Sequence, residues 1–234
     1  MEKTQLRTPF FVVNPKSYLY GEEIYALAKK TDELAAKYDF DVLFTAQLID
    51  LPHIIETCPH LIPCAQHMES LKPGRGMGHV LPEALAAAGV KATFLNHAEN
   101  PCTVHELAST IARANEVGIL TVVCADSVEE GEWIAGLHPD VMVCELTSLI
   151  GTGQVAGEDY MRASTEAVKA VSPQTKVLQA AGISTGQNVY DAIKYGADAT
   201  GGTSGIVAAE DPFATLDEMF EALDRARTDF CKEA

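Results

Sequence analysis

The amino-acid sequence predicts an α/β fold, a single (β/α)8 barrel that occupies residues 1–234 as one domain. Short runs of apolar residues alternate with segments whose apolar residues recur at helical spacing, and this alternation is unbroken along the chain. In most of these runs the apolar residues are consecutive and do not alternate with polar ones, which is typical of strands buried on both faces of a parallel sheet. Eight such pairs in a chain of 234 residues favour a closed barrel.

The predicted strands are short and rich in β-branched and other apolar residues. They are expected at residues 10–14 (FFVVN), 41–46 (DVLFTA), 61–66 (LIPCAQ), 92–97 (ATFLNH), 120–125 (LTVVCA), 140–145 (DVMVCE), 176–181 (KVLQAA) and 198–203 (DATGGT). The predicted helices fill the segments between them, at residues 22–38, 48–58, 81–89, 103–118, 128–137, 158–171, 185–196 and 211–227. Four glycines stand where helices are expected to end, at positions 89, 118, 136 and 196.

The composition is typical of a soluble globular protein, with 47% apolar and 21% charged residues. A formal net charge of −16 argues against a nucleic-acid partner, because such binding requires clustered lysine and arginine. No run approaches the roughly 20 apolar residues of a membrane span, and the N-terminal apolar run is too short for a signal peptide. We therefore expect a cytoplasmic protein that does not bind membranes.

The six cysteines lie far apart in the sequence. Cys58, His60 and Cys64 come nearest to a metal-binding cluster, but two prolines stand beside these cysteines, as in turns. Because cysteine is among the residue types most often buried, reduced and mostly buried thiols are expected, and no metal site.

Chemistry in a (β/α)8 barrel takes place at the carboxyl ends of the strands. Lys16, His97 and Glu145 come from the ends of the first, fourth and sixth predicted strands, so the barrel would bring them to one pocket. Asn14 and Gln66 are further polar residues at strand ends. Taken alone, each of the three charged or titratable side chains could be a solvated or capping residue, and only their common location favours a catalytic site.

Three glycine-containing loops at the same end of the barrel suggest a phosphate site. Gly151 to Gly153 follow the sixth strand, Gly182 precedes a predicted helix cap at Ser184 and Thr185, and Gly201 to Gly205 end the eighth strand. Backbone N–H groups at such turns and at helix N-termini bind dianions without net positive charge. The alternative is that these glycines serve only tight turn geometry.

Six segments, taken in order and with their spacing, resemble the triosephosphate isomerase family, and specifically its shorter archaeal-type branch. They are VNPKSY, AQHME, GHVLPEALAAAGV, LNHAEN, LIGTG and AAGISTG, and the resemblance extends from about Phe10 to Leu223. It implies a TIM barrel that isomerises a small sugar phosphate, an aldose and its ketose, by proton transfer through an enediolate. The pair that the resemblance favours is glyceraldehyde 3-phosphate and dihydroxyacetone phosphate. The resemblance also implies no metal or organic cofactor and a homodimer or homotetramer.

The resemblance assigns roles to residues of this chain. Glu145 matches the base, His97 the neutral electrophile, Lys16 and Asn14 the pair that orients the substrate, and Glu99 the acidic residue after the histidine. The segment that begins at Glu145 matches the base followed by a lid over the phosphate. The expected phosphate contacts are Gly151, Gly182, Thr203, Ser204 and Gly205.

The chain departs from the family pattern beside these residues. Leu146, Thr147 and Ser148 stand where the family normally begins the lid with proline, Ala98 stands where serine is usual, and Pro101 stands where arginine is expected. Met77 replaces a threonine that reaches the neighbouring subunit. These departures leave two alternatives open: an isomerase of another short phosphorylated ketose, such as a tetrulose phosphate, or a barrel that binds a sugar phosphate without catalysis.

Overall fold

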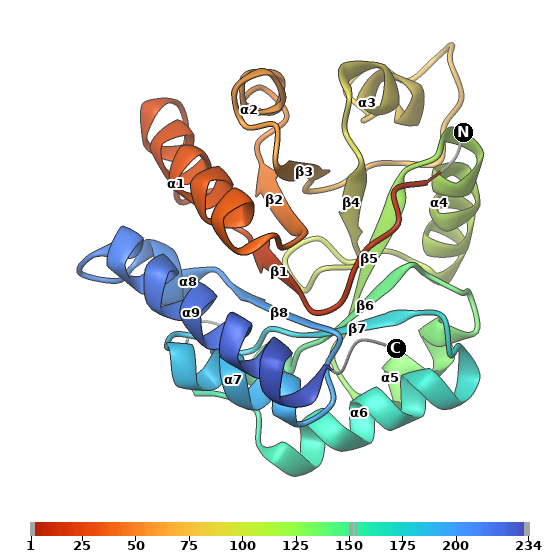
Figure 1. The fold of residues 1–234 in the computed structure, drawn as a ribbon. Coiled ribbons are helices and arrows are strands. Elements are labelled where there is room, and N and C mark those ends of the chain that lie inside the picture. Colours follow the sequence, from red (N-terminus) through yellow and green to blue (C-terminus); the bar gives the residue numbers. More distant parts are fainter. Residues whose placement is uncertain (1–2, 150–151, 153, 232–234) are drawn as a thin grey trace.

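A closed parallel barrel of eight strands forms the centre of the computed structural model, which describes residues 3–149, 152 and 154–231 (Figure 1). The strands are β1 Phe10–Val13, β2 Val42–Ala46, β3 Leu61–Ala65, β4 Ala92–Leu95, β5 Leu120–Ala125, β6 Val141–Cys144, β7 Lys176–Gln179 and β8 Ala199–Gly202. Each neighbour in sequence is a neighbour in the barrel, and β8 pairs with β1. The predicted fold class is confirmed, with every strand within two residues of its expected bounds.

The helices form a ring around the barrel (Figure 1). They are α1 Glu22–Tyr38, α2 Leu51–Thr57, α3 Pro82–Ala88, α4 Val104–Val117, α5 Val128–Ala135, α6 Glu158–Val171, α7 Gly186–Lys194, α8 Ser204–Val207 and α9 Pro212–Phe230, with a 3-10 turn, η1, at Thr147–Leu149. The sequence did not predict α8, because one helical turn is too short to show a periodic pattern. Gly89 and Gly118 end α3 and α4 in the left-handed conformation, as expected.

Side chains of each strand alternate between two apolar layers. Phe10 and Val12 point into the barrel, where they pack with Leu43, Phe94 and Leu178. Phe11 and Val13 point outward to the helices, and the ring of Phe11 lies 5.1 Å from that of Phe220 on α9, centroid to centroid. Burial on both faces explains why the strands contain so few polar residues.

The cysteines are free thiols, and four of them are buried. Cys58 packs among the outer layer and Cys64 in the barrel interior, so they do not form a common site. His60 is instead paired with Asp32, with 3.0 Å between Nδ1 and Oδ2. Within the described part of the chain, no group of three His, Cys, Asp or Glu side chains is placed to hold a metal ion.

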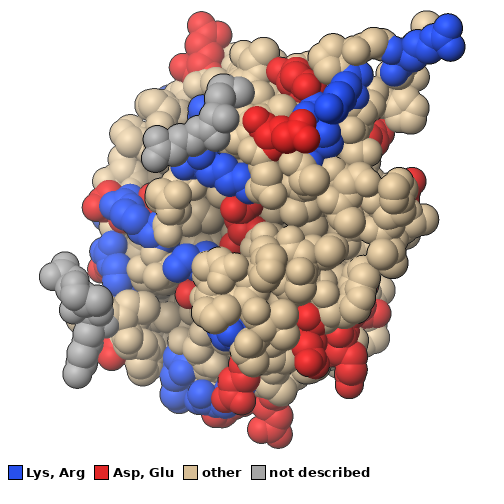
Figure 2. Space-filling model, turned by 90° about the vertical axis from the view of Figure 1, so that its right-hand side faces the viewer, with Lys and Arg blue, Asp and Glu red and all other residues tan. Residues whose placement is uncertain are grey.

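Acidic and basic side chains are interspersed among neutral ones on the face shown in Figure 2. Among the described residues of that face there is no extended basic area of the kind that a phosphate backbone requires. Over residues 3–149, 152 and 154–231, no helix has both the length and the apolar character needed to cross a bilayer.

Glycine allows the last strand to approach the first closely enough to close the barrel. A Cβ atom on Gly201 of β8 would lie 2.1 Å from the backbone oxygen of Val12 on β1. This oxygen is part of the backbone and cannot turn aside as the end of a flexible side chain could. A larger residue at position 201 would therefore force the two strands apart.

We expect Gly201→Ala to lower the free energy of unfolding by about 1–3 kcal/mol or more, because the added methyl group overpacks the β1–β8 contact. Urea denaturation followed by circular dichroism would measure this. Gly131→Ala is the matched control. Gly131 lies in α5, where alanine favours the helix, and its added Cβ would lie at an ordinary contact distance of 3.5 Å from the side chain of Val168 on α6. Equal midpoints for the Gly201 variant and the unmodified protein would contradict the packing argument.

Candidate active site

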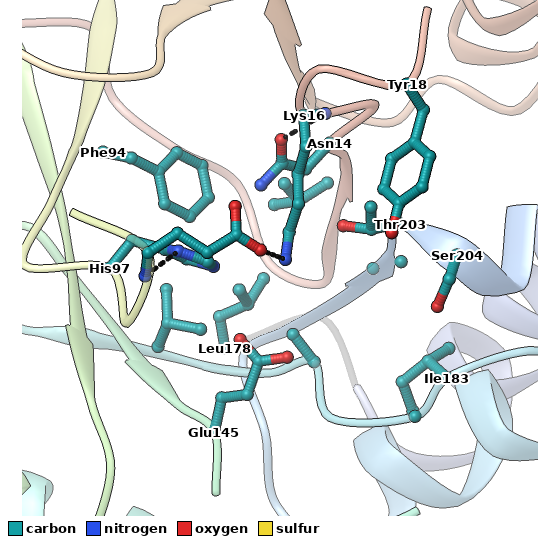
Figure 3. Close-up of a pocket in the computed structure, with 17 residues that line it drawn as sticks. Asn14, Lys16, Tyr18, Phe94, His97, Glu145, Leu178, Ile183, Thr203 and Ser204 are labelled. Carbon is teal, nitrogen blue, oxygen red and sulfur yellow. Dashed lines mark hydrogen bonds and ion pairs between the residues drawn. The ribbon is translucent and has the colours of Figure 1, made fainter. Parts of the chain in front are cut away.

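A cavity of about 210 Å³ opens at the carboxyl ends of the strands (Figure 3). Eight of the residues expected from the sequence line it: Asn14, Lys16, His97, Glu99, Glu145, Gly182, Thr203 and Ser204. Gly151 lies outside the described residues. Gly205 does not line the cavity. Tyr18 and Phe94 also line it. Neither could be predicted from the sequence, because an aromatic residue in or near a strand is usually part of the apolar core.

The backbone of Lys16 is held in an uncommon conformation, with a φ of 48°. Its N–H donates to Oδ1 of Asn14 at 3.1 Å, and its carbonyl oxygen accepts from Nε2 of Gln66 at 2.6 Å. Oδ1 of Asn14 also accepts from the hydroxyl of Thr45 at 2.5 Å. These bonds fix the loop after β1 and direct the lysine side chain into the cavity (Figure 3).

The Lys16 ammonium forms an ion pair with Glu99, with 2.7 Å between Nζ and Oε1. The side chain of Lys16 is 14% exposed and that of Glu99 is 62% exposed. The hydrogen bond from Lys16 is the main reason why the pKa of Glu99 lies below its ordinary value. Lys16 is the one lysine or arginine among the described residues that line the cavity.

His97 is held in one tautomer by the backbone. Its Nδ1 accepts a hydrogen bond from the N–H of Glu99 at 3.1 Å, so the neutral ring carries its proton on Nε2. Burial lowers the pKa of His97, and the nearby Lys16 ammonium lowers it further. The ring is therefore neutral near pH 7, and it can donate a hydrogen bond from Nε2 without carrying charge.

Glu145 follows β6 and lies across the cavity from Lys16 and His97 (Figure 3). Its backbone N–H donates to the carbonyl oxygen of Ala125 at 3.0 Å, which extends the β5–β6 pairing by one residue. Burial raises the pKa of its carboxyl group against the opposing effect of Lys16. No described side chain or N–H donates a hydrogen bond to this carboxylate. A poorly solvated carboxylate without such donors is a stronger base than a glutamate in water.

The opposite end of the cavity is built from the loops after β7 and β8. Gly182 has a φ of 72°, and a Cβ there would lie 2.0 Å from the backbone oxygen of Gln154, so only glycine fits. Thr185 caps α7 with its side chain, as expected. Ser204 begins α8, and such loops together with a short extra helix form the recurrent phosphate site of this fold.

Gly205 packs against the backbone outside the cavity. A Cβ on it would lie 2.1 Å from the carbonyl oxygen of Ile183, in the loop after β7. This close contact accounts for glycine at position 205. That the N–H group of Gly205 binds a phosphate stays a prediction.

A (β/α)8 barrel with a carboxylate that receives no hydrogen bond from any described group, a neutral imidazole and an ammonium around one cavity defines a class of enzyme that moves protons on a small substrate. The triosephosphate isomerase family model matches residues 9–210. The chain belongs to the triosephosphate isomerase family.

Curated relatives agree with this family. A triosephosphate isomerase from Methanothermus fervidus is 31% identical over 90% of this chain and 97% of its own length. One from Sulfurisphaera tokodaii is 30% identical over 95% of this chain and its own full length. One from Methanopyrus kandleri is 33% identical over 94% of this chain and 100% of that protein. The resemblance to the archaeal-type branch is thereby confirmed.

The two glutamates of the site should affect stability in opposite directions. Because folding raises the pKa of Glu145, its ionised form destabilises the folded protein near pH 7. Glu145→Gln should therefore increase the free energy of unfolding there. The difference should shrink as the pH falls through the folded pKa and vanish below the unfolded value of about 4.3.

Glu99→Gln is the matched control, because folding lowers the pKa of Glu99. It should decrease the free energy of unfolding at pH 7, and that loss should disappear as the pH falls through the lowered pKa. Urea denaturation from pH 3 to 8 would measure both variants. A Glu145→Gln variant less stable than the unmodified protein at pH 7 would show that the carboxylate is stabilised in the fold.

Proposed function

We propose that this chain interconverts glyceraldehyde 3-phosphate and dihydroxyacetone phosphate without a cofactor. The observation that carries the proposal is the position of the Glu145 carboxylate, which faces Lys16 and the neutral His97 across one cavity. Membership of the triosephosphate isomerase family supports the same reaction.

The residues of the cavity suffice for the proton transfers. Glu145 removes a proton from the carbon beside the carbonyl group, and the electron pair moves onto the carbonyl oxygen to give an enediolate. The Lys16 ammonium and the Nε2–H group of His97 donate hydrogen bonds to the oxygen where negative charge develops. The hydroxyl proton on the carbon that lost its hydrogen then passes to the former carbonyl oxygen, and Nε2 of His97 relays it by giving up its own proton and taking the other. Glu145 returns a proton to the adjacent carbon as the new carbonyl group forms, so that the base ends the cycle ionised.

The phosphate group requires local stabilisation in a chain with a net charge of −16. We assign this to Lys16, to backbone N–H groups in the loops at Gly182 and Thr203, and to Ser204 at the start of α8. The positive end of a short helix and exposed N–H groups hold a dianion without additional lysine or arginine. Gly151 keeps the same expected role from the sequence.

A second candidate substrate is a longer phosphorylated ketose, such as a tetrulose phosphate. Another cavity of about 240 Å³ shares Lys16, His97 and Glu99 with the first and is lined further by Ser17, Gln66, His67 and Asn100. Polar side chains in this extension could accept an additional hydroxymethyl group.

A coupled assay with glyceraldehyde 3-phosphate, run beside the erythrulose phosphates, would test the proposal. We expect rapid turnover of the triose, and Glu145→Asp should lower kcat by about a hundredfold or more with little change in KM, because shortening the side chain misplaces the base. Glu145→Gln is the blank.

Each other outcome of the assay has a distinct meaning. Rapid turnover of a tetrulose phosphate alone would assign the reaction to the second candidate. Unchanged turnover in Glu145→Asp would contradict the assignment of the base. Absence of turnover, with phosphoglycolate raising Tm no more than inorganic phosphate does, would indicate a protein that binds without catalysis.

We also propose that the chain is a homodimer or homotetramer. Met77 is fully exposed, on a segment after β3 that contains no helix or strand as far as Val80. Beside this segment lies a groove of about 450 Å³ lined by residues that include Met68, Leu71 and Pro101. A fully exposed methionine next to a partly apolar groove fits a contact between two copies.

Light scattering on the purified protein should give two or four times the chain mass of 25.1 kDa. Met77→Glu should shift the protein toward the monomer, because a charge cannot be buried in such a contact without a large desolvation cost. A fully active monomer at micromolar concentration would contradict the proposed assembly. The cytoplasmic location expected from the sequence stays a prediction.

A further inference from the structure

The segment after the base is attached to the end of β5 by a side chain as well as by the backbone. Ala125 pairs with Cys144 in the sheet, and its carbonyl oxygen then accepts from the N–H of Glu145 at 3.0 Å. Two residues further on, the acceptor is a side chain and not a backbone carbonyl group. The N–H of Thr147 donates to Oδ1 of Asp126 at 2.5 Å. Asp126 therefore continues the attachment two residues beyond Glu145.

Thr147 begins η1, the single turn Thr147–Leu149. The first N–H groups of a helical turn have no partner within the turn, and a carboxylate is a favourable acceptor for them. Bonds at Glu145 and at Thr147 thus hold the backbone on both sides of Leu146.

Asp126 is itself fixed by α5 and by the loop that carries the electrophile. Its N–H donates to Oε2 of Glu130 at 2.6 Å. The other oxygen of Glu130 accepts from Nδ2 of Asn96 at 3.3 Å, and Asn96 directly precedes His97. The carboxylates of Asp126 and Glu130 therefore connect the segment after Glu145 to the segment before His97.

Side-chain packing leaves space beside the base. A cavity of about 270 Å³, separate from the proposed substrate cavity, is lined by Glu145 and Thr147 together with Ala98, Pro101 and Asp126. A side chain that borders two cavities is not confined by close contacts on either side. Its position must therefore depend on how its backbone is held.

We propose that Asp126 is a positioning residue for the reaction: its hydrogen bond to Thr147 fixes the backbone after Glu145 and thereby sets the position of the base. The catalytic part of this inference rests on the function proposed above. Misplacement of a base by about 1 Å can lower a rate a hundredfold, so loss of one of the two backbone attachments should reduce kcat while leaving the loops after β7 and β8 in place.

Two measurements test the contact without using activity. In Asp126→Ala, amide exchange at Thr147 should accelerate by about tenfold or more, because the N–H loses its acceptor. The pKa of Glu145, followed by NMR of its carboxyl carbon, should fall toward the ordinary value as the side chain gains contact with water. Asp126→Asn keeps an oxygen acceptor but removes the charge, so it should restore both values toward those of the unmodified protein. Exchange at Thr147 that is unchanged in Asp126→Ala would overturn the inference.

A double-mutant cycle with Thr147→Pro tests the effect on catalysis, because proline has no N–H to donate. Asp126→Ala should lower kcat by about tenfold with KM within about twofold, whereas it should have little further effect in the Thr147→Pro background. Glu129→Ala, at an exposed acid on the first turn of α5, is the control that should leave kcat unchanged.

An equal loss of kcat in both backgrounds would overturn the role of the Thr147 contact. A loss confined to KM would overturn the role in positioning the base. If the unmodified protein turned over neither sugar phosphate, the proposed function would fail, while the exchange and pKa results would still decide whether Asp126 positions Glu145.

Discussion

Closure of the barrel between β8 and β1 is the contact on which the arrangement of the site depends. The residues of the cavity come from five strands and the loops that follow them, and they converge only because the sheet returns on itself. The two strands meet where Gly201 faces the backbone of Val12. Lys16 follows the first strand and Ser204 follows the last, so an open sheet would leave these two residues at opposite edges.

The electrostatics of the site follow from burying two carboxyl groups to different extents near one ammonium group. Glu99 is largely exposed and bonded to Lys16, and its pKa falls. Glu145 is half-buried without a described hydrogen-bond donor, and its pKa rises. His97 stays neutral because it is buried beside a cation and because a backbone N–H occupies Nδ1. The same chemical group is thus a partner for lysine in one environment and a stronger base than usual in the other, which is the role proposed for Glu145.

The sequence was informative where a feature depends on local pattern. Short, mostly apolar runs that alternate with helical patterns predicted all eight strands, and the position of Glu145 after β6 predicted that it would face the cavity. The sequence could not predict α8, because four residues show no periodicity. The bond between Asp126 and Thr147 was also out of reach, because it joins side chain and backbone of two loops whose geometry arises only in the closed barrel. The packing of Gly205 against Ile183 could not be predicted from the sequence for the same reason, because it too joins two loops that meet only in the closed barrel.

The ion pair between Lys16 and Glu99 has a consequence for the ionic-strength dependence of binding. A phosphorylated substrate that uses the ammonium must compete with a carboxylate already bonded to it at 2.7 Å. Dissolved salt screens the attraction of Lys16 for the incoming dianion, and it also screens the attraction for Glu99. Because the two effects partly cancel, Glu99 acts as an internal counterion that makes the affinity of the site less sensitive to salt than that of a free lysine.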